Sequence, residues 1–486
     1  MSLFDVCKKS LTSSLYHKSH CFQFKHKQIQ ILDKPKDFYE YLKTSIDNAE
    51  KRIFFASLYL GKKEEELIHC LSKAMKRNKD LKLYFIVDGL RGTRETPNPC
   101  SASLLATLCK DYGDRVDIRC YKTPSCFRWQ NKFLPKRINE GIGLQHMKIY
   151  GFDDEVVLSG ANLSKDYFTN RQDRYYIFKG NKSFSNYYFN LHQMISQLSF
   201  KVLYDDSLAK YKLQWPSSNS STNPEINYEL FLKGSSKSVE FFLKSPIENN
   251  FEENNEKFPT LVYPVSQLTP LFLDHENDYS TEKPTLLNLF KSLNNSHSKF
   301  NWDFTTGYFN MLPALRKLLI RSASTEKVHG NVITASAFAN GFYKSKGISG
   351  LLPDAYHHLA FNFLKKVKRN NSNISLSEWK LGEVNKPNGW SYHAKGIWIT
   401  PSGEYELPIL TTIGSSNYTS RAYTTDLEND CIILTSDENL RLQMKDELKN
   451  IKKNTKELSL TDFKNDPQKR VKLSIKIMTK MLENKL

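Results

Sequence analysis

Two short stretches of the chain each place a histidine two positions before a lysine. They are His146 with Lys148, and His393 with Lys395. Residues i and i+2 of a strand point to the same face, so we expect each imidazole to project beside its ammonium group. A neutral imidazole can attack phosphorus, a second can move protons, and ammonium groups stabilise phosphoryl oxygens. The two stretches therefore indicate phosphodiester chemistry by paired histidines.

Each histidine is followed by an asparagine and then an acid. Asn162 and Asp173 are eleven positions apart, and so are Asn417 and Glu428. The histidine-to-asparagine spacing is eight positions longer in the second copy, which a longer hairpin loop at 400–408 absorbs at little entropic cost. This pattern predicts an internal repeat. We expect both amides to contact phosphoryl oxygens and both carboxylates to accept a hydrogen bond from a ring nitrogen, which fixes its tautomer.

The elements that must position these groups alternate along the chain. The hydrophobic patterns predict strands at 53–60, 81–87, 144–152, 156–158, 304–309, 328–335, 392–399 and 407–413, and helices at 63–77, 104–110, 353–368 and beyond 437. This order favours an α/β fold of two pseudo-symmetric lobes, each a mixed sheet flanked by helices. One active site is expected at the interface between the lobes.

Composition suggests where the lobes begin and end. Residues 1–32 contain one acid and several lysines and serines, which fits a possible targeting segment or a frayed basic terminus. Residues 33–215 are predicted to form the N-terminal lobe. The segment 216–260 is Ser/Asn/Pro-rich and then Asn/Glu-rich, as in a linker or loop. Residues 261–486 form the expected C-terminal lobe with a charged helical end.

The overall charge limits the classes of partner. The 486 residues carry a formal net charge of +18, which favours nucleic acid, acidic lipid or a phosphorylated substrate, although a lysine-rich solvated surface explains it equally well. No uninterrupted apolar run is long enough to span a bilayer. The eight cysteines lack metal-type spacing, so free thiols are expected and no metal site is predicted.

These motifs resemble those of the phospholipase D superfamily. Residues 146–153 (HMKIYGFD) match its HxKxxxxD signature, and residues 393–400 match it except that Thr400 replaces the acid. Residues 413–417 (IGSSN) match the GSxN element, and in residues 159–162 (SGAN) Gly160 replaces its serine. The resemblance implies that Asp153 belongs to the first motif and that Ser415 contacts substrate.

Longer segments resemble the eukaryotic mitochondrial phosphatidylglycerophosphate synthases. They are residues 57–61, 91–95, 134–154, 159–175, 306–310, 333–342, 346–356 and 389–398. This resemblance implies transfer of a phosphatidyl group from CDP-diacylglycerol to glycerol 3-phosphate through a phosphatidyl-histidine, with His146 favoured as the nucleophile. It also implies a peripheral position on the mitochondrial inner membrane and no nucleic-acid partner. The mechanism requires no cofactor, although Mg²⁺ or Mn²⁺ could assist the phosphates.

Other residues are candidates for binding substrate or membrane. Arg91 and Arg94 follow the predicted strand 81–87, where open α/β sheets place ligand loops, and two guanidinium groups suit the phosphate of glycerol 3-phosphate. Arg174 is a similar candidate. The segment 127–137 interleaves aromatic and basic residues and is the favoured membrane-facing entrance on an anionic surface. The apolar stripe of the helix 353–368 is more readily explained by core packing.

Three alternatives remain open at this level. A nucleic-acid phosphodiesterase fits the positive charge, but Asp153 and the flanking segments favour a lipid enzyme. A phosphatidylserine or cardiolipin synthase would use the same site on another acceptor. Thr400 is also compatible with a catalytically inactive scaffold.

Overall fold

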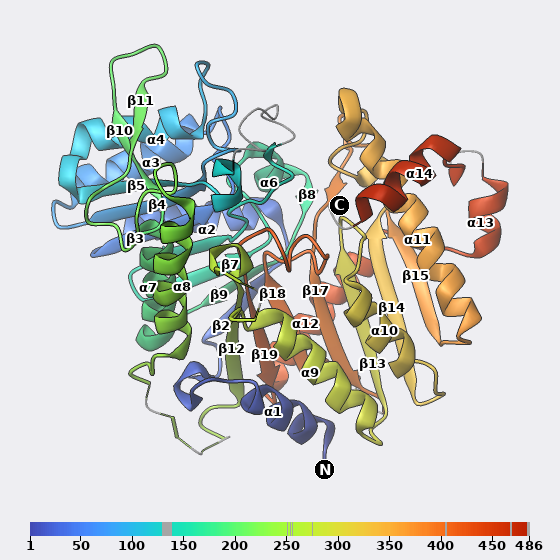
Figure 1. Cartoon of the computed structure of the whole chain (residues 1–486). Helices are drawn as coiled ribbons and strands as arrows, with labels where there is room; N and C mark the ends of the chain where they lie inside the picture. Colours follow the sequence, from blue (N-terminus) through green and yellow to red (C-terminus); the bar gives the residue numbers. More distant parts are fainter. Residues whose placement is uncertain are drawn as a thin grey trace.

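The computed structural model describes residues 1–128, 139–249, 251–252, 254, 256–274, 276–403, 406–466 and 469–483. Within these ranges the chain forms two large sheets with helices around them (Figure 1). No helix in the same ranges combines the length and the apolar composition needed to cross a bilayer.

The first large sheet lies in the N-terminal lobe. Among the described residues it has nine strands in the order β11-β10-β5-β4-β3-β6-β7-β9-β2. They are β2 (Ile29–Leu32), β3 (Arg52–Ser57), β4 (Lys82–Asp88), β5 (Val116–Tyr121), β6 (Ile149–Phe152), β7 (Glu155–Ser159), β9 (Tyr175–Phe178), β10 (Phe200–Tyr204) and β11 (Tyr211–Gln214). The strands β3, β4 and β5 are parallel and most of their residues are buried, as expected when helices cover both faces.

The second large sheet repeats this plan. Its nine described strands follow the order β1-β12-β19-β18-β17-β13-β14-β15-β20. They are β1 (Phe22–Phe24), β12 (Thr260–Gln267), β13 (Phe300–Thr306), β14 (Val328–Ala335), β15 (Ile374–Trp379), β17 (Gly396–Pro401), β18 (Leu410–Gly414), β19 (Glu428–Thr435) and β20 (Thr455–Glu457). The run β5-β4-β3-β6-β7-β9 corresponds to β15-β14-β13-β17-β18-β19, so the predicted internal repeat and two-lobed α/β fold are confirmed.

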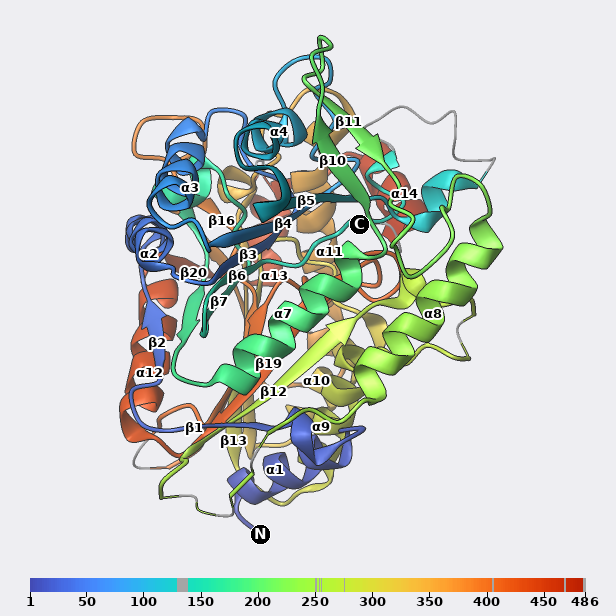
Figure 2. The same cartoon turned by 90° about the vertical axis from the view of Figure 1, so that its left-hand side faces the viewer.

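The helices flank both sheets. They are α1 (Leu3–Ser13), α2 (Pro35–Asn48), α3 (Glu65–Arg77), α4 (Ser101–Tyr112), α6 (Lys165–Thr169), α7 (Lys182–Ser196), α8 (Tyr228–Lys244), α9 (Glu282–Asn295), α10 (Pro313–Ser322), α11 (Leu352–Arg369), α12 (Glu438–Lys452), α13 (Leu460–Asn465) and α14 (Leu473–Leu482). Figure 2 shows α7 and α8 running side by side over one face of the molecule. One apolar cluster includes Ile149 and Leu158 of the first lobe and Ile413 and Cys431 of the second, so the lobes share a core at their junction.

The segment between the lobes differs from its prediction. Residues 216–260, expected as a linker or loop, contain the 17-residue helix α8. Its buried residues Phe231, Leu232, Val239 and Leu243 follow a helical spacing that the surrounding serines and asparagines obscure. This helix packs against α7, so the segment is part of the core.

The first 32 residues are an ordered part of the fold. The helix α1 packs against α9, the strand β1 pairs with β12, and β2 pairs with β9. The N-terminal segment therefore contributes a strand to each large sheet. Its expected role in targeting stays a prediction.

The predicted strands 144–152 and 392–399 are shorter than expected. β6 begins at Ile149 and β17 at Gly396, so both histidine–lysine stretches precede the regular strands. In place of pairing within their own sheet, the two stretches pair with the opposite lobe: His146 N–H donates to the carbonyl of Leu427, and His393 N–H to that of Gln172.

Candidate active site

Two buried histidine–carboxylate pairs join the lobes. Nδ1 of His146 lies 3.0 Å from both carboxylate oxygens of Glu428, and Nδ1 of His393 lies 2.7 Å from Oδ2 of Asp173. His146 and Asp173 belong to the N-terminal lobe, and the other two belong to the C-terminal lobe. All four side chains are buried. Each histidine is thus oriented by a carboxylate from the opposite half of the chain.

Backbone pairing next to each side-chain pair explains this crossed arrangement. The strand β16 (Ser391–Tyr392) runs parallel to β8 (Arg171–Gln172), which brings His393 beside Asp173 one residue later. In the other copy, the backbone of Gln145 bridges to that of Leu427, one residue before His146 and Glu428. The same short bridge therefore occurs twice, and each bridge fixes one imidazole against one carboxylate.

The lysines of both motifs are buried beside their histidines. Lys148 and Lys395 are 1% and 2% exposed, so they reach no bulk solvent. Nζ of Lys395 lies 2.8 Å from the carbonyl oxygen and 3.2 Å from Nε2 of His393. Nζ of Lys148 donates to the carbonyl of His146. Although neither motif lies within a regular strand, each lysine points back to its own histidine as expected.

The two asparagines keep polar atoms free. Nδ2 of Asn162 donates to the hydroxyl of Tyr167 at 3.1 Å. Within the described residues, Oδ1 of Asn162 and Oδ1 of Asn417 are buried and have no hydrogen-bond partner. The oxygen and nitrogen of an amide can be interchanged by a flip, so each side chain can present either a donor or an acceptor. Buried polar groups are nearly always paired, and these two amides are therefore available to a ligand.

Burial dominates the ionisation of this cluster. It lowers the pKa of Lys148 to about 7, with a contribution from nearby Lys395, and lowers the pKa of Lys395 to about 8. Burial also raises the pKa of Asp173 to about 6 and that of Glu428 to about 7. It holds the pKa of both histidines well below 6.5, with the adjacent lysine as the next cause. Burial therefore favours the neutral form of each imidazole, and each imidazole titrates as a coupled pair with its carboxylate.

Three further residues surround His393 and were missed by the sequence reasoning. The rings of Tyr167 and Tyr308 lie edge-on to that of His393, with centroids 5.2 and 5.5 Å away. The Tyr167 hydroxyl is 3.4 Å from Nε2 of the histidine. The guanidinium of Arg171 lies 4.4 Å from the centre of the Tyr167 ring and lowers the pKa of His393. Arg171 lies two positions before Asp173, a placement that could have drawn attention to it.

The structure places Arg91 and Arg94 in the loop after β4, as expected. The guanidinium of Arg91 lies 4.1 Å from the centre of the Tyr59 ring, and the Tyr59 hydroxyl is 3.3 Å from that of Ser164. Nη1 of Arg94 lies 3.0 and 3.1 Å from the two carboxylate oxygens of Glu140. Both arginines are thus already engaged within the N-terminal lobe, and their role in binding glycerol 3-phosphate stays a prediction.

Asp153 is not positioned for catalysis. Its carboxylate accepts the backbone N–H groups of Glu50, Lys51 and Arg52 at 2.7 to 2.9 Å. It therefore fixes the chain that enters β3, and its expected place in the site is corrected to a structural one. At the matching position, Thr400 pairs with Asn301 between β17 and β13. The strand ladder of the second lobe therefore continues through Thr400 without a carboxylate at this position.

The expectation that Arg174 binds substrate is wrong. The side chain is 1% exposed, and Nε donates to Glu447 of α12 at 2.8 Å. Its other nitrogens donate to the carbonyls of Lys395 and Thr412 and to the Tyr176 hydroxyl. The guanidinium thus ties the two lobes together and has no donor left for a phosphate. A Cβ on Gly396 would collide with Nη1 of Arg174, which explains the glycine at the start of β17.

Ser415 also has another partner than the expected substrate. Its hydroxyl donates to Oε2 of Glu428 at 2.5 Å. Ser415 therefore positions the carboxylate that holds His146. In the first lobe, a Cβ on Gly160 would lie 2.6 Å from Oδ1 of Asp173, so that close approach leaves no room for a serine.

The remaining predictions concern metals and membranes. In the described part of the chain, no group of three or more histidine, cysteine, aspartate and glutamate side chains is arranged to hold a metal ion. The stripe on α11 is largely buried, which confirms core packing. Of the predicted entrance at 127–137, only Phe127 and Arg128 lie within the described residues.

Comparison with known proteins gives close relatives. The chain is 50% identical over 489 residues to the CDP-diacylglycerol–glycerol-3-phosphate 3-phosphatidyltransferase of Saccharomyces cerevisiae, covering 99% of this chain and 92% of the relative. It is 39% identical to the protein of that name from Schizosaccharomyces pombe, covering 94% of each chain. The human relative, whose name adds "mitochondrial", is 29% identical, covering 94% and 82%. No model of a known protein family matches.

A solved structure shows the same fold. Phosphatidylserine synthase of Haemophilus influenzae superposes with a TM-score of 0.73 over the whole of both chains, at 17% sequence identity. The two-lobed arrangement is therefore shared with that protein.

The crossed pairs lead to a prediction for two carboxylate variants. We expect Asp173→Asn and Glu428→Gln each to lower kcat on a phosphodiester substrate by roughly 10³- to 10⁴-fold, because an amide no longer fixes the ring tautomer or stabilises the imidazolium. Steady-state kinetics on folded protein would measure this. Asp153→Asn is the matched control: it should lower the melting temperature without a comparable loss of kcat. A loss of less than about tenfold in Asp173→Asn or Glu428→Gln would contradict this assignment.

Proposed function

The chain belongs to the CDP-diacylglycerol–glycerol-3-phosphate 3-phosphatidyltransferase family, and we propose that it makes phosphatidylglycerophosphate and CMP by a two-step transfer through a phosphatidyl-histidine. Membership confirms the expected family and reaction. The observation that carries the two-step mechanism is the pair of crossed histidine–carboxylate contacts, which orients two imidazoles within one buried site.

In the first step, His146 attacks the phosphorus that carries the diacylglycerol. Its Nδ1 faces Glu428, while Nε2 makes no hydrogen bond with the described residues and has a lone pair free for attack. The N–P bond forms, and the P–O bond to CMP breaks. His393, held by Asp173, gives a proton to the departing phosphate oxygen.

In the second step, the roles of His393 reverse. The neutral imidazole removes a proton from a hydroxyl of glycerol 3-phosphate, and the resulting oxygen attacks the phosphorus. The N–P bond breaks and returns His146 to its starting form. Because leaving group and acceptor use the same side of the phosphorus in turn, one proton-transfer residue serves both steps.

The cations and amides would stabilise the charge of the transferred phosphoryl group. Lys148 and Lys395 lie beside the two rings, and the free amide atoms of Asn162 and Asn417 complete the set. Arg171, whose charge contributes to lowering the pKa of His393 after burial and Lys395, is a further candidate for contact with a substrate phosphate. The scheme itself uses no cofactor, and Mg²⁺ or Mn²⁺ would act with the pyrophosphate of the donor.

The proposed location of the protein rests on its substrates and on its relatives. The donor carries two acyl chains, so the site must open to a membrane surface. We propose a peripheral position on the inner mitochondrial membrane, supported by the names of the vertebrate relatives and by the positive net charge. No nucleic-acid partner is proposed.

The reaction can be tested by offering several substrates to the purified chain. With CDP-diacylglycerol as donor, we expect labelled glycerol 3-phosphate to enter lipid with release of one CMP per product. Serine and phosphatidylglycerol should remain unused as acceptors, and labelled single-stranded DNA should stay intact. Cleavage of DNA without lipid product, or transfer to serine in preference to glycerol 3-phosphate, would overturn the proposed function.

The ionisation of the site predicts a narrow bell-shaped pH profile for kcat/KM. Asp173 and Glu428 have raised pKa values of about 6 and 7, so they lose their charge as the pH falls through that range. Lys148 and Lys395 have lowered pKa values of about 7 and 8, so they lose theirs as the pH rises. The rate should therefore fall on both sides of neutral pH.

Lys148→Arg provides the check on the alkaline side. Lys148 has the lower pKa of the two lysines, about 7, so it is the first to lose its charge as the pH rises. Arginine stays charged at all accessible pH values, so the alkaline limb of the variant should shift to higher pH, even if its maximal rate is lower. A monotonic profile for the unmodified protein through the neutral range would count against the scheme, and so would an alkaline limb that the arginine leaves in place.

A further inference from the structure

The last described helix exposes a row of large apolar side chains. Leu473, Ile477 and Met481 of α14 are 72%, 54% and 79% exposed. They are four residues apart, so they lie on one stripe of the helix. Ile475 and Thr479 of the same helix are buried against the protein. At roughly 100° per residue, Ile477 lies nearly opposite this buried side, and the apolar row faces outward.

A row of lysines runs parallel to the apolar row. Lys472, Lys476 and Lys480 each precede one of the outward apolar residues by one position, and all three are exposed. The helix itself contains no acidic residue. Glu483, just beyond its end, lies 3.8 Å from Arg316 of α10. An apolar stripe beside a cationic stripe is the pattern of a helix that lies in the surface of an anionic bilayer.

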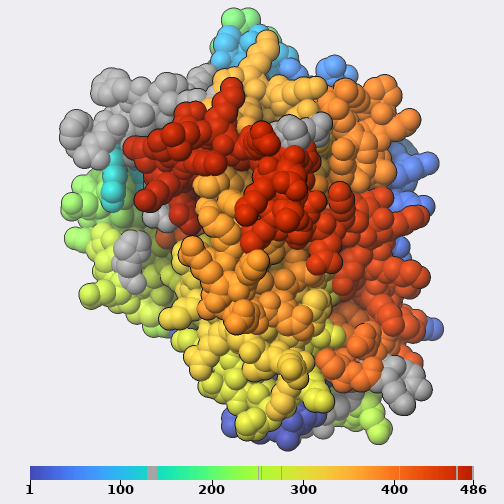
Figure 3. Space-filling model, turned by 90° about the vertical axis from the view of Figure 1, so that its right-hand side faces the viewer, coloured from blue at the N-terminus to red at the C-terminus, as the bar shows by residue number. Residues whose placement is uncertain are grey.

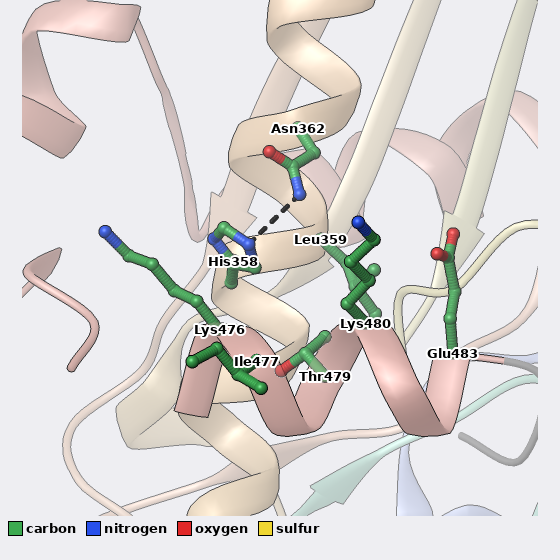
Figure 4. A pocket seen from close by; sticks show the side chains of 8 residues that line it. All are labelled: His358, Leu359, Asn362, Lys476, Ile477, Thr479, Lys480 and Glu483. Carbon is green, nitrogen blue, oxygen red and sulfur yellow. Dashed lines mark hydrogen bonds between the residues drawn. The ribbon is translucent and has the colours of Figure 1, made fainter. Parts of the chain in front are cut away.

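The helix α11, which packs against α14, connects it to the candidate active site. Figure 4 shows His358 and Asn362 of α11 beside α14, with the hydrogen bond between them. Two residues before His358 on α11, the ring of Tyr356 lies 5.5 Å from that of Tyr308, which itself lies 5.5 Å from the ring of His393. The helix that carries α14 therefore also borders the reaction centre.

The end of α14 makes a second connection to the site. The carbonyl of Glu483 accepts a hydrogen bond from Nδ2 of Asn310, two residues beyond Tyr308. In Figure 1, α14 runs toward the junction between the lobes, and Figure 3 shows the C-terminal helices in red on the outer surface. The exposed row thus lies on the outside of the structure that encloses His393.

We propose that α14 is a membrane-docking element, whose apolar row inserts into the acyl boundary of an anionic lipid bilayer while its lysines contact the lipid phosphates. This inference rests on the proposed function, because a diacyl donor must reach the buried histidines from a membrane. A membrane is favoured over a protein partner for two reasons. The apolar row matches the acyl-chain region of a lipid surface and the lysine row matches its headgroup phosphates, and the chain carries a net charge of +18.

Vesicle flotation of the full chain tests this proposal. We expect binding to vesicles of equal parts phosphatidylcholine and phosphatidylglycerol, and much weaker binding to phosphatidylcholine alone. Replacing Lys472, Lys476 and Lys480 together by Gln should lower the partition coefficient about 100-fold, from about fivefold per charge. Ile477→Glu combined with Met481→Glu should lower it at least about tenfold.

The matched control is Leu442→Glu. Leu442 is 45% exposed on α12, which Figure 2 shows on the opposite side of the molecule from α14, and this variant should bind as the unmodified chain does. Circular dichroism and melting temperatures confirm that all variants are folded. Absence of binding by the unmodified chain, equal binding to both kinds of vesicle, or unchanged binding by the α14 variants would overturn the proposal. The same holds if these variants only dissociate a dimer, since the row would then be a self-association surface.

Activity measurements separate this proposal from the proposed function. With a short-chain, soluble donor, the α14 variants should keep the kcat of the unmodified chain. With the donor embedded in vesicles, their apparent KM should rise at least about tenfold. If the α14 variants lose lipid binding but the unmodified chain transfers a phosphatidyl group from neither donor, the docking role is retained and the proposed reaction is rejected.

Discussion

The crossed contact between each histidine and a carboxylate of the other lobe is the constraint on which the rest of the structure depends. Neither lobe holds a complete pair, so the chemistry exists only when the two sheets are joined. The molecule reinforces this junction with the two backbone bridges, the shared apolar core and the buried Arg174–Glu447 ion pair. A displacement of about 1 Å at the junction would move both buried imidazole rings relative to the phosphorus, and misplacements of that size lower catalytic rates about 100-fold.

Burial of the same contacts determines the electrostatics. Two lysines, two carboxylates and two imidazoles share a volume with little access to water, and each charged form is penalised there. The lysines bind protons weakly, and the carboxylates hold them more firmly than usual. A phosphodiester entering this cluster would supply the negative charge that the lysines lack. The free amide atoms of Asn162 and Asn417 would gain partners at the same time, so the empty site is prepared for an anion.

The repeat explains what the sequence could predict and what it could not. The spacing of His146, Asn162 and Asp173 against its second copy was enough to predict two lobes and one shared site. The crossing of the pairs was not predictable, because it depends on contacts between lobes. Local spacing also said nothing about the partners of Asp153, Ser415 and Arg174, and these were assigned to the site by resemblance or proximity in sequence. The structure shows that Asp153 and Arg174 stabilise the framework and that Ser415 orients Glu428.

The central claim is that two imidazoles act on one phosphorus atom, one of them through a covalent bond. The direct test is to mix the protein with CDP-diacylglycerol labelled in its lipid phosphate, without acceptor, quench the reaction and locate the label by mass spectrometry. The account predicts an acid-labile phosphatidyl group on His146, formed with release of CMP and discharged when glycerol 3-phosphate is added. A label on any residue other than the two histidines, or CMP release that occurs only with acceptor and leaves no labelled protein, would contradict it.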